Sequence, residues 1–103
     1  MKPDEFPEAF RLKATAFAHA EADAMRAEKK AKRIYSQLII SMSGSINQRE
    51  HEARTMDAFV EAEEAAIDAA TKANVLKGEL ESMRISWETW RSLNAQRRAE
   101  MKL

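Results

Sequence analysis

Residues 59–90 read FVEAEEAAIDAATKANVLKGELESMRISWETW, and apolar side chains recur in them every seven positions. A second such ladder occupies residues 6–38, and a glycine-centred break, Ser43-Gly44-Ser45, separates the two. A seven-residue apolar period winds slowly around an α-helix and is satisfied by a second helix lying alongside it. The ladder consists of Phe6, Phe10, Phe17, Ala20, Ala24, Ala27, Ala31, Ile34 and Leu38, and then of Phe59, Ala62, Ala66, Ala69, Ala73, Leu76, Leu80, Met83, Trp87 and Trp90. The sequence therefore predicts an all-α fold, an antiparallel helical hairpin or coiled coil.

The pattern places a single helical domain over residues 1–103. We expect the first helix at about residues 7–42, a turn at 43–46 and the second helix at about 47–99. The second helix exceeds the first in length, which predicts a C-terminal helical extension. Gly78 is its weak point and the expected position of any kink, because glycine destabilises a helix interior by roughly 1 kcal/mol relative to alanine.

The expected helix ends carry residues that suit them. Pro7 fits a first turn, where its missing N–H costs nothing. Asn47 is the expected N-cap of the second helix, and Glu50 is three residues further on, as in a capping box. A turn this short forces the helices antiparallel, so residues whose numbers sum to about 90 should face each other.

Composition limits the classes of protein to which the chain can belong. Charged residues make up 33% and apolar residues 45%, and the formal net charge is zero. There is no cysteine, which excludes disulfides and thiolate metal sites and fits a reducing compartment. No apolar run approaches the roughly 20 residues that span a bilayer. We expect a soluble protein of the cytoplasm, without a membrane partner.

Several apolar residues miss the seam between the two helices. They include Ile39, Ile40, Val60, Ile67, Val75 and Ile85. Two helices alone leave most of these side chains in water, so either two chains associate into a bundle or the C-terminal segment folds back as a third helix, with scattered exposed apolar residues as the less favoured third alternative. We expect self-association into a homo-oligomer, whose copy number the alanine-rich seam does not specify.

Basic residues cluster in the first helix, within residues 25–43. The register places Asp57, Glu61, Glu63, Glu64 and Asp68 opposite them. We interpret the cluster as neutralised by the facing helix and by solvent, with a nucleic-acid patch as the less favoured alternative.

The C-terminal segment combines tryptophan with arginine. Its candidate partner-binding residues are Arg84, Trp87, Trp90, Arg91, Arg97 and Arg98. An aromatic platform edged with guanidinium groups suits a protein partner, and it also suits the stacking of unpaired bases beside phosphates. The structural interpretation is that both tryptophans are core residues of the ladder. A net charge of zero disfavours nucleic acid as the main ligand.

Signs of catalytic chemistry are missing from the sequence. It has no glycine-rich phosphate loop and no strand for a nucleophile elbow. His19 and His51 lack the Glu-x-x-His spacing of di-iron bundles and read as solvated or interface residues. Glu61, Glu64 and Asp68 share a face that is read as solvated and not as a metal site. We expect no enzyme activity, no cofactor and no metal.

The stretches NVLKGELE (74–81), WETWR (87–91) and RRAEM (97–101) resemble small helical proteins encoded by bacteriophages, over the last third of the chain. That resemblance implies a bacterial host cell and a role in DNA replication or recombination, or in blocking a host defence or repair protein. It assigns no residue a role.

The resulting hypothesis is a non-catalytic helical interaction protein, a phage-encoded adaptor or inhibitor that binds a protein of nucleic-acid processing or defence. The alternative is an accessory protein of replication or recombination that binds single-stranded nucleic acid. Both hypotheses use the same C-terminal tryptophan and arginine residues.

Overall fold

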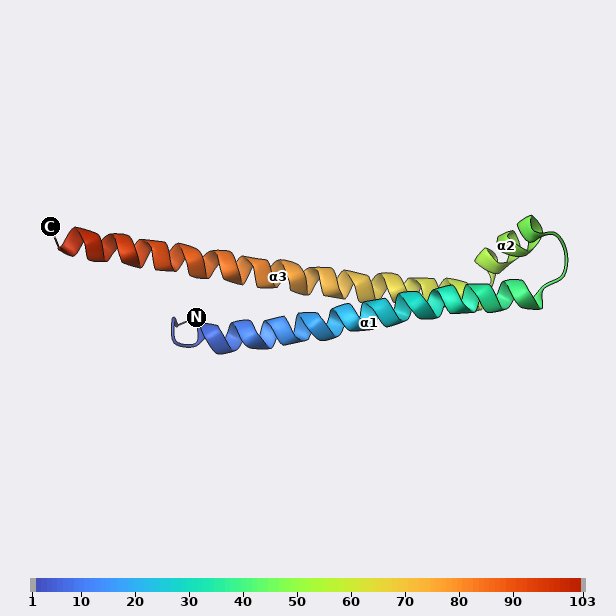
Figure 1. Cartoon of the computed structure of the whole chain (residues 1–103), viewed down its shortest axis with the longest axis horizontal. Coiled ribbons are helices and arrows are strands. Elements are labelled where there is room, and N and C mark those ends of the chain that lie inside the picture. The colour runs from blue at the N-terminus through green and yellow to red at the C-terminus, as the bar shows by residue number, and fades with distance from the viewer. Residues whose placement is uncertain (1, 103) are drawn as a thin grey trace.

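The computed structural model describes residues 2–102 as an elongated antiparallel hairpin. Its helices are α1 (Phe6–Ser41), α2 (Ile46–Thr55) and α3 (Asp57–Met101). α1 and α3 lie side by side, and the molecule measures 82 × 21 × 15 Å (Figure 1). No strand occurs among the described residues. The predicted all-α antiparallel hairpin with a C-terminal helical extension is confirmed.

The seam between α1 and α3 is built mainly on alanine. Its four buried residues are Ala20 and Ala31 in α1 and Ala62 and Ala73 in α3. Every predicted ladder residue is buried or half-buried except Trp90, which keeps 42% of its surface exposed. Alanine allows the two backbones to approach closely, but each methyl group removes little apolar surface from water. The seam is therefore long and thin.

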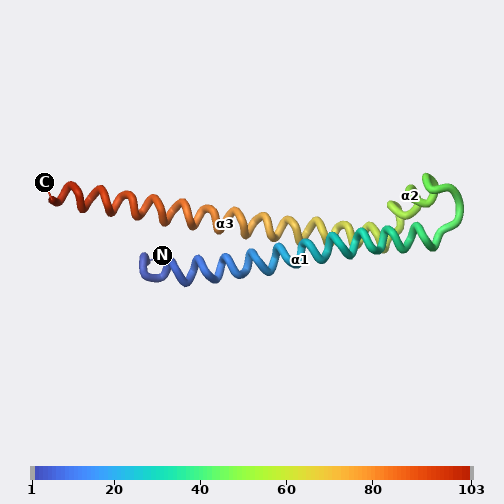
Figure 2. The backbone as a smooth tube through the Cα atoms, in the orientation of Figure 1, coloured from blue at the N-terminus to red at the C-terminus, as the bar shows by residue number. Residues whose placement is uncertain are grey.

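Aromatic contacts near both ends of α1 show the register of the hairpin. Phe6 stacks on Trp87, with ring centroids 4.4 Å apart, and Tyr35 packs against Phe59 at 5.2 Å. The numbers of these facing residues sum to 93 and 94, a few residues above the predicted sum of about 90. The difference arises because α2 departs from the axis of α3 (Figures 1 and 2), so the connection between the paired helices α1 and α3 is longer than the predicted turn at 43–46.

The predicted continuous helix over 47–99 is wrong at Met56. This residue has extended backbone angles, φ −74° and ψ 137°, and it separates α2 from α3. The predicted weak point, Gly78, lies instead inside the unbroken α3. A Cβ atom built on Gly78 meets no atom within 4 Å, because the residue is on the open outer face.

Packing accounts for the short α2 better than helix propensity does. Ala53 is fully buried, and α2 lies against both α1 and α3. Arg49 donates from Nη1 to the carbonyl of Ile39 at 3.5 Å, near the C-terminal end of α1, where the backbone N–H of Met42 also donates to this carbonyl at 3.4 Å. A straight helix would point these residues away from α1, so folding back brings them into contact with it.

The N-cap of α2 also differs from the predicted Asn47. Ser45 is the cap: its hydroxyl accepts from the backbone N–H of Gln48, and the Gln48 side chain accepts from the backbone N–H of Ser45. The capping box is thus shifted two residues towards the turn. Gly44 precedes it with φ of 111°, a left-handed conformation that favours glycine.

Replacing Ala73 by Asp should test the seam. Ala73 is buried, so the new carboxylate would lose hydration without gaining a partner, and unfolding free energy should fall by roughly 2–3 kcal/mol. Thermal unfolding followed by circular dichroism measures this. The matched control is Ala65→Asp, at an exposed position of the same helix, which should change stability by less than roughly 0.5 kcal/mol. Equal loss in both variants would contradict the seam assignment.

The two glycines should respond in opposite directions to alanine. Gly78→Ala should stabilise the protein by roughly 1 kcal/mol, because α3 is continuous there and the added methyl has open space. Gly44→Ala should destabilise it, because a Cβ would lie 2.9 Å from Gln48 Oε1 and the backbone angle is left-handed. Chemical denaturation of both variants gives the two signs, and a loss of stability in Gly78→Ala would show that α3 needs a bend.

Candidate functional site

α3 extends beyond α1 at the open end of the hairpin. Phe6, the first residue of α1, lies against Trp87, so residues 88–101 of α3 continue beyond α1 as a single helix (Figures 1 and 2). We call residues 88–101 the C-terminal overhang. At 1.5 Å per residue it measures about 20 Å. The chain before α1 reaches only its beginning, where Lys2 and Pro3 line a small hollow with Trp90.

An aromatic cluster marks the point where the overhang leaves the hairpin. Trp87 is sandwiched between Phe6, at 4.4 Å and 7°, and Trp90, at 5.0 Å and 20°. Phe10 extends the cluster through a contact with Phe6 at 5.5 Å. Trp87 is half-buried and belongs to the seam, whereas Trp90 is partly exposed. The structure thus separates two tryptophans that the sequence pattern treats alike.

Arg84 is the predicted site residue that forms ion pairs within its own helix. It forms ion pairs with Glu81 and, at 2.8 Å, with Glu88. The hydrogen bond that Arg84 donates to Glu81 lowers the pKa of the Glu81 carboxyl, and the same bond raises the pKa of Arg84. These contacts brace the outer surface of α3 just before the overhang. Arg84 therefore offers less to a partner than the arginines that follow it.

The other three arginines extend from the overhang without an ion-pair partner, and Glu88 and Glu100 are the acidic residues of this segment. Within residues 2–102, no ion pair involves Arg91, Arg97 or Arg98. Arg98 donates from Nε to the backbone carbonyl of Asn94 at 3.4 Å, and all three side chains are exposed. Because Glu88 forms an ion pair with Arg84, the overhang carries a surplus of positive charge.

The seam face of α3 continues along the overhang with no helix opposite it. Trp90 is followed at helical spacing by Asn94, Arg97 and Met101. Leu93 and Met101 are 50% and 85% exposed. This face has the form of one half of a coiled coil, apolar at both ends, with one amide side chain and one basic side chain between them. It is where the predicted site residues Trp90, Arg91, Arg97 and Arg98 come together.

Ion pairing departs from the prediction for the basic cluster of α1. Arg26 pairs with Asp23 and Lys32 with Glu28, both within α1. In the described part of the chain, the one ion pair that joins α1 to α3 is Lys13–Glu79, at 2.6 Å. The acidic residues of α3 that face the cluster are thus near it in register without forming ion pairs with it. Solvent and neighbours on the same helix neutralise most of these charges.

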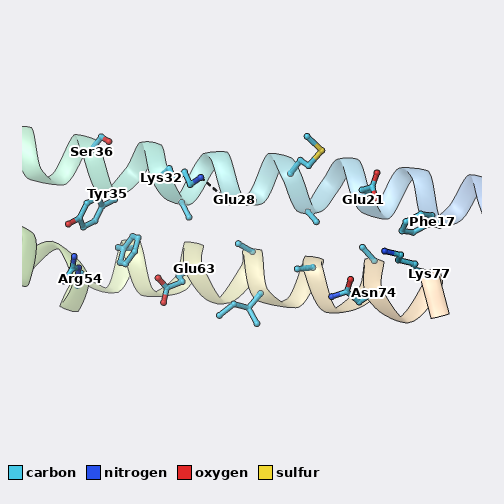
Figure 3. Close-up of a pocket in the computed structure, with 18 residues that line it drawn as sticks. Phe17, Glu21, Glu28, Lys32, Tyr35, Ser36, Arg54, Glu63, Asn74 and Lys77 are labelled. Carbon is cyan, nitrogen blue, oxygen red and sulfur yellow. Dashed lines mark ion pairs between the residues drawn. The ribbon is translucent and has the colours of Figure 1, made fainter. Parts of the chain in front are cut away.

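An open groove between α1 and α3 is the feature that sequence reasoning missed. It holds about 850 Å³ and runs from Phe17 to Tyr35 (Figure 3). Successive alanines at and beside the seam leave this hollow, since a methyl group fills little of the space between two helices. The signal in the sequence was the off-seam residue Ile67, which lines the groove beside alanine-rich ladder positions.

The histidine and acidic side chains singled out in the sequence do not gather into a cluster. In residues 2–102, no group of three acidic or histidine side chains is arranged to hold a metal ion. His19 and His51 are exposed, as are Glu61, Glu64 and Asp68. Among the same residues, no helix is long and apolar enough to cross a membrane. The overhang and the groove are therefore the two surface features that could bind a partner or ligand.

Comparison with known proteins leaves the assignment to this geometry. No protein-family model matches the chain, and no significant match was found among curated proteins or among solved structures.

Proposed function

We propose that this chain is a non-catalytic interaction protein whose C-terminal overhang docks a helix of a protein partner. The observation that carries the proposal is the uncovered seam face of residues 88–101. A helix laid on this face would continue the coiled coil beyond the end of α1 and would bury Trp90 and Met101, which solvent now reaches.

The charges of the overhang indicate the chemistry of that partner. Arg91, Arg97 and Arg98 flank or interrupt the apolar face and form no ion pair among the described residues. An amphipathic helix with Glu or Asp beside its apolar stripe would supply the missing carboxylates. A buried tryptophan beside arginines that pair with carboxylates of the partner is also typical of interface hot spots.

The resemblance to small bacteriophage proteins supports a narrower form of the proposal. In that form, the chain is an adaptor or inhibitor, and its partner is a host or phage protein of nucleic-acid processing or defence. Inhibition would follow if the overhang occupied a surface that the partner needs for its own contacts.

A second candidate function is binding of single-stranded nucleic acid by the overhang. The exposed face of Trp90 and the three arginines favour it, since bases stack on aromatic rings and guanidinium groups contact phosphates. Against it stands the net charge of zero, which provides no sustained positive field to attract a polyanion. The protein partner is the better-supported candidate.

Fluorescence anisotropy with two labelled probes tests the proposal. One probe is a synthetic acidic helical peptide with leucine at heptad spacing and glutamate beside it, and the other is a 20-nucleotide single strand. The peptide should bind. The variant R91Q/R97Q/R98Q should weaken binding at least tenfold, equivalent to about 1.4 kcal/mol, with helical content retained.

The matched control removes three positive charges elsewhere. K29Q/K30Q/R33Q changes three exposed residues of α1 and should leave peptide affinity unchanged. A scrambled peptide of the same composition should bind at least tenfold more weakly. Tighter binding of the single strand than of the peptide, with a steep loss of affinity as salt rises, would replace the proposal with the nucleic-acid function.

A further inference from the structure

The groove between α1 and α3 has apolar residues on both rims and on its floor. Ala24 and Ala31 from α1 and Ala66 and Ala70 from α3 line it. Met25 on one rim is 54% exposed, and Ile67 on the other is 58% exposed. This surface lies along the body of the hairpin, away from the overhang, since the lining residues of α3 end at Lys77.

We propose that the groove is a dimer interface, on which a second copy of the chain packs face to face. The twofold axis runs parallel to the long axis of the hairpin, so that α1 of each copy lies over α3 of the other. The product is an antiparallel four-helix bundle. This inference goes beyond the proposed function and does not depend on it.

Residues that face each other across the groove give the reason for a second copy. Met25 and Ile67 both line the groove near its middle, and the register of the Phe6–Trp87, Tyr35–Phe59 and Lys13–Glu79 contacts places the two residues at about the same level. Towards the turn, Lys32 is level with Glu63 (Figure 3). A twofold axis along the groove keeps each residue at its own level and moves it to the opposite rim. Met25 then meets Ile67 of the second copy, and Lys32 meets its Glu63, each contact occurring twice.

The other end of the groove continues the same complementarity. Glu21 on α1 lies near the level of Asn74 and Lys77 on α3 (Figure 3). The axis along the groove therefore brings Glu21 towards Lys77 of the second copy. Together with Lys32 and Glu63, this gives opposite charges on both sides of the apolar centre. Such an arrangement sets register and orientation more than it adds affinity.

An axis across the groove at Met25 gives a poorer match. It would lay α1 over α1 and bring Glu21 close to the level of Glu28 of the second copy, so that carboxylates would approach each other. In the proposed arrangement Glu28 stays paired with Lys32 of its own chain, at 3.1 Å, and Lys32 lies between it and the incoming Glu63. The charges thus select the axis parallel to the helices.

The size of the surface is sufficient for a dimer. From residue 17 to residue 36 the groove extends about 28 Å at 1.5 Å per residue. If the contact spans the full 21 Å extent of the molecule, its footprint is at most roughly 600 Å² per chain, or about 1,200 Å² in total. That area is at the lower limit of stable interfaces, which predicts a dimer that dissociates on dilution into the micromolar range.

The parallel axis has one consequence for the open end of the hairpin. Both overhangs project from the same end of the bundle, so the dimer presents two copies of Trp90 and its arginines in one direction. Two linked sites raise apparent affinity when a target offers two matching sites.

Sedimentation velocity of the full chain from 1 to 100 µM tests the interface. The wild type should reach twice its chain mass of 11.7 kDa. Ile67→Glu, at an exposed rim position, should raise the dimer dissociation constant at least tenfold with helical content intact. Val75→Glu is the matched control, since Val75 is 55% exposed and does not line the groove, and it should change nothing.

A charge exchange tests the orientation. K32E alone would set a new carboxylate against Glu63 of the second copy, and E63K alone would set a new ammonium group against its Lys32, so each should weaken the dimer. The double variant K32E/E63K should recover it. A wild-type monomer at 100 µM, a dimer insensitive to Ile67→Glu, or failure of the double variant to recover would each overturn the proposal. Binding of an apolar dye by such a monomer would assign the groove to a small ligand instead.

Discussion

Close approach of two alanine-lined helix faces is the constraint on which the rest of this structure depends. Ala20 and Ala31 meet α3 where Ala62 and Ala73 meet α1, and these methyl groups allow the backbones to lie near each other. Large side chains at these positions would push the helices apart and fill the groove. The small residues instead keep the hairpin narrow and leave one flank hollow. The stability that such a seam provides is modest, because the apolar area buried per residue is small.

Larger side chains supply the register that alanine cannot. A row of methyl groups slides past another row at little cost, so specificity has to come from a few distinctive contacts. The Phe6–Trp87 stack, the Tyr35–Phe59 contact and the Lys13–Glu79 ion pair are spread along the hairpin and agree on one alignment. The ion pairs within single helices contribute little to this choice, since exposed pairs typically contribute roughly 0–1 kcal/mol and do not join the helices.

The overhang and the groove have two different physical causes. α3 is nine residues longer than α1, and among residues 2–102 no helix faces the seam residues at its C-terminal end. Along the shared length, the seam has a partner but too little side-chain volume to fill the space on one flank. Partner binding at the overhang and self-association along the groove would each cover apolar surface that the single hairpin leaves exposed.

Much of the fold was predictable from the apolar period alone. A repeat of seven residues constrains helix type, pairing and the facing residues together, and all the predicted ladder residues other than Trp90 are at least half-buried. The basic and aromatic character of the C-terminal site was also visible, because it depends on residue type and helical spacing. These features are local or periodic, so the sequence expresses them directly.

Tertiary packing decided the remaining features. The sequence favoured a kink at Gly78, but a glycine on an open outer face meets no atom that would force a bend, whereas burial of Ala53 draws α2 out of line at Met56. The ladder treated Trp87 and Trp90 alike, but only Trp87 lies opposite a residue of α1, because Phe6 is where that helix begins. Helix breaks and exposure depend on what packs from elsewhere in the chain, and a local period carries no information about where the opposite helix ends.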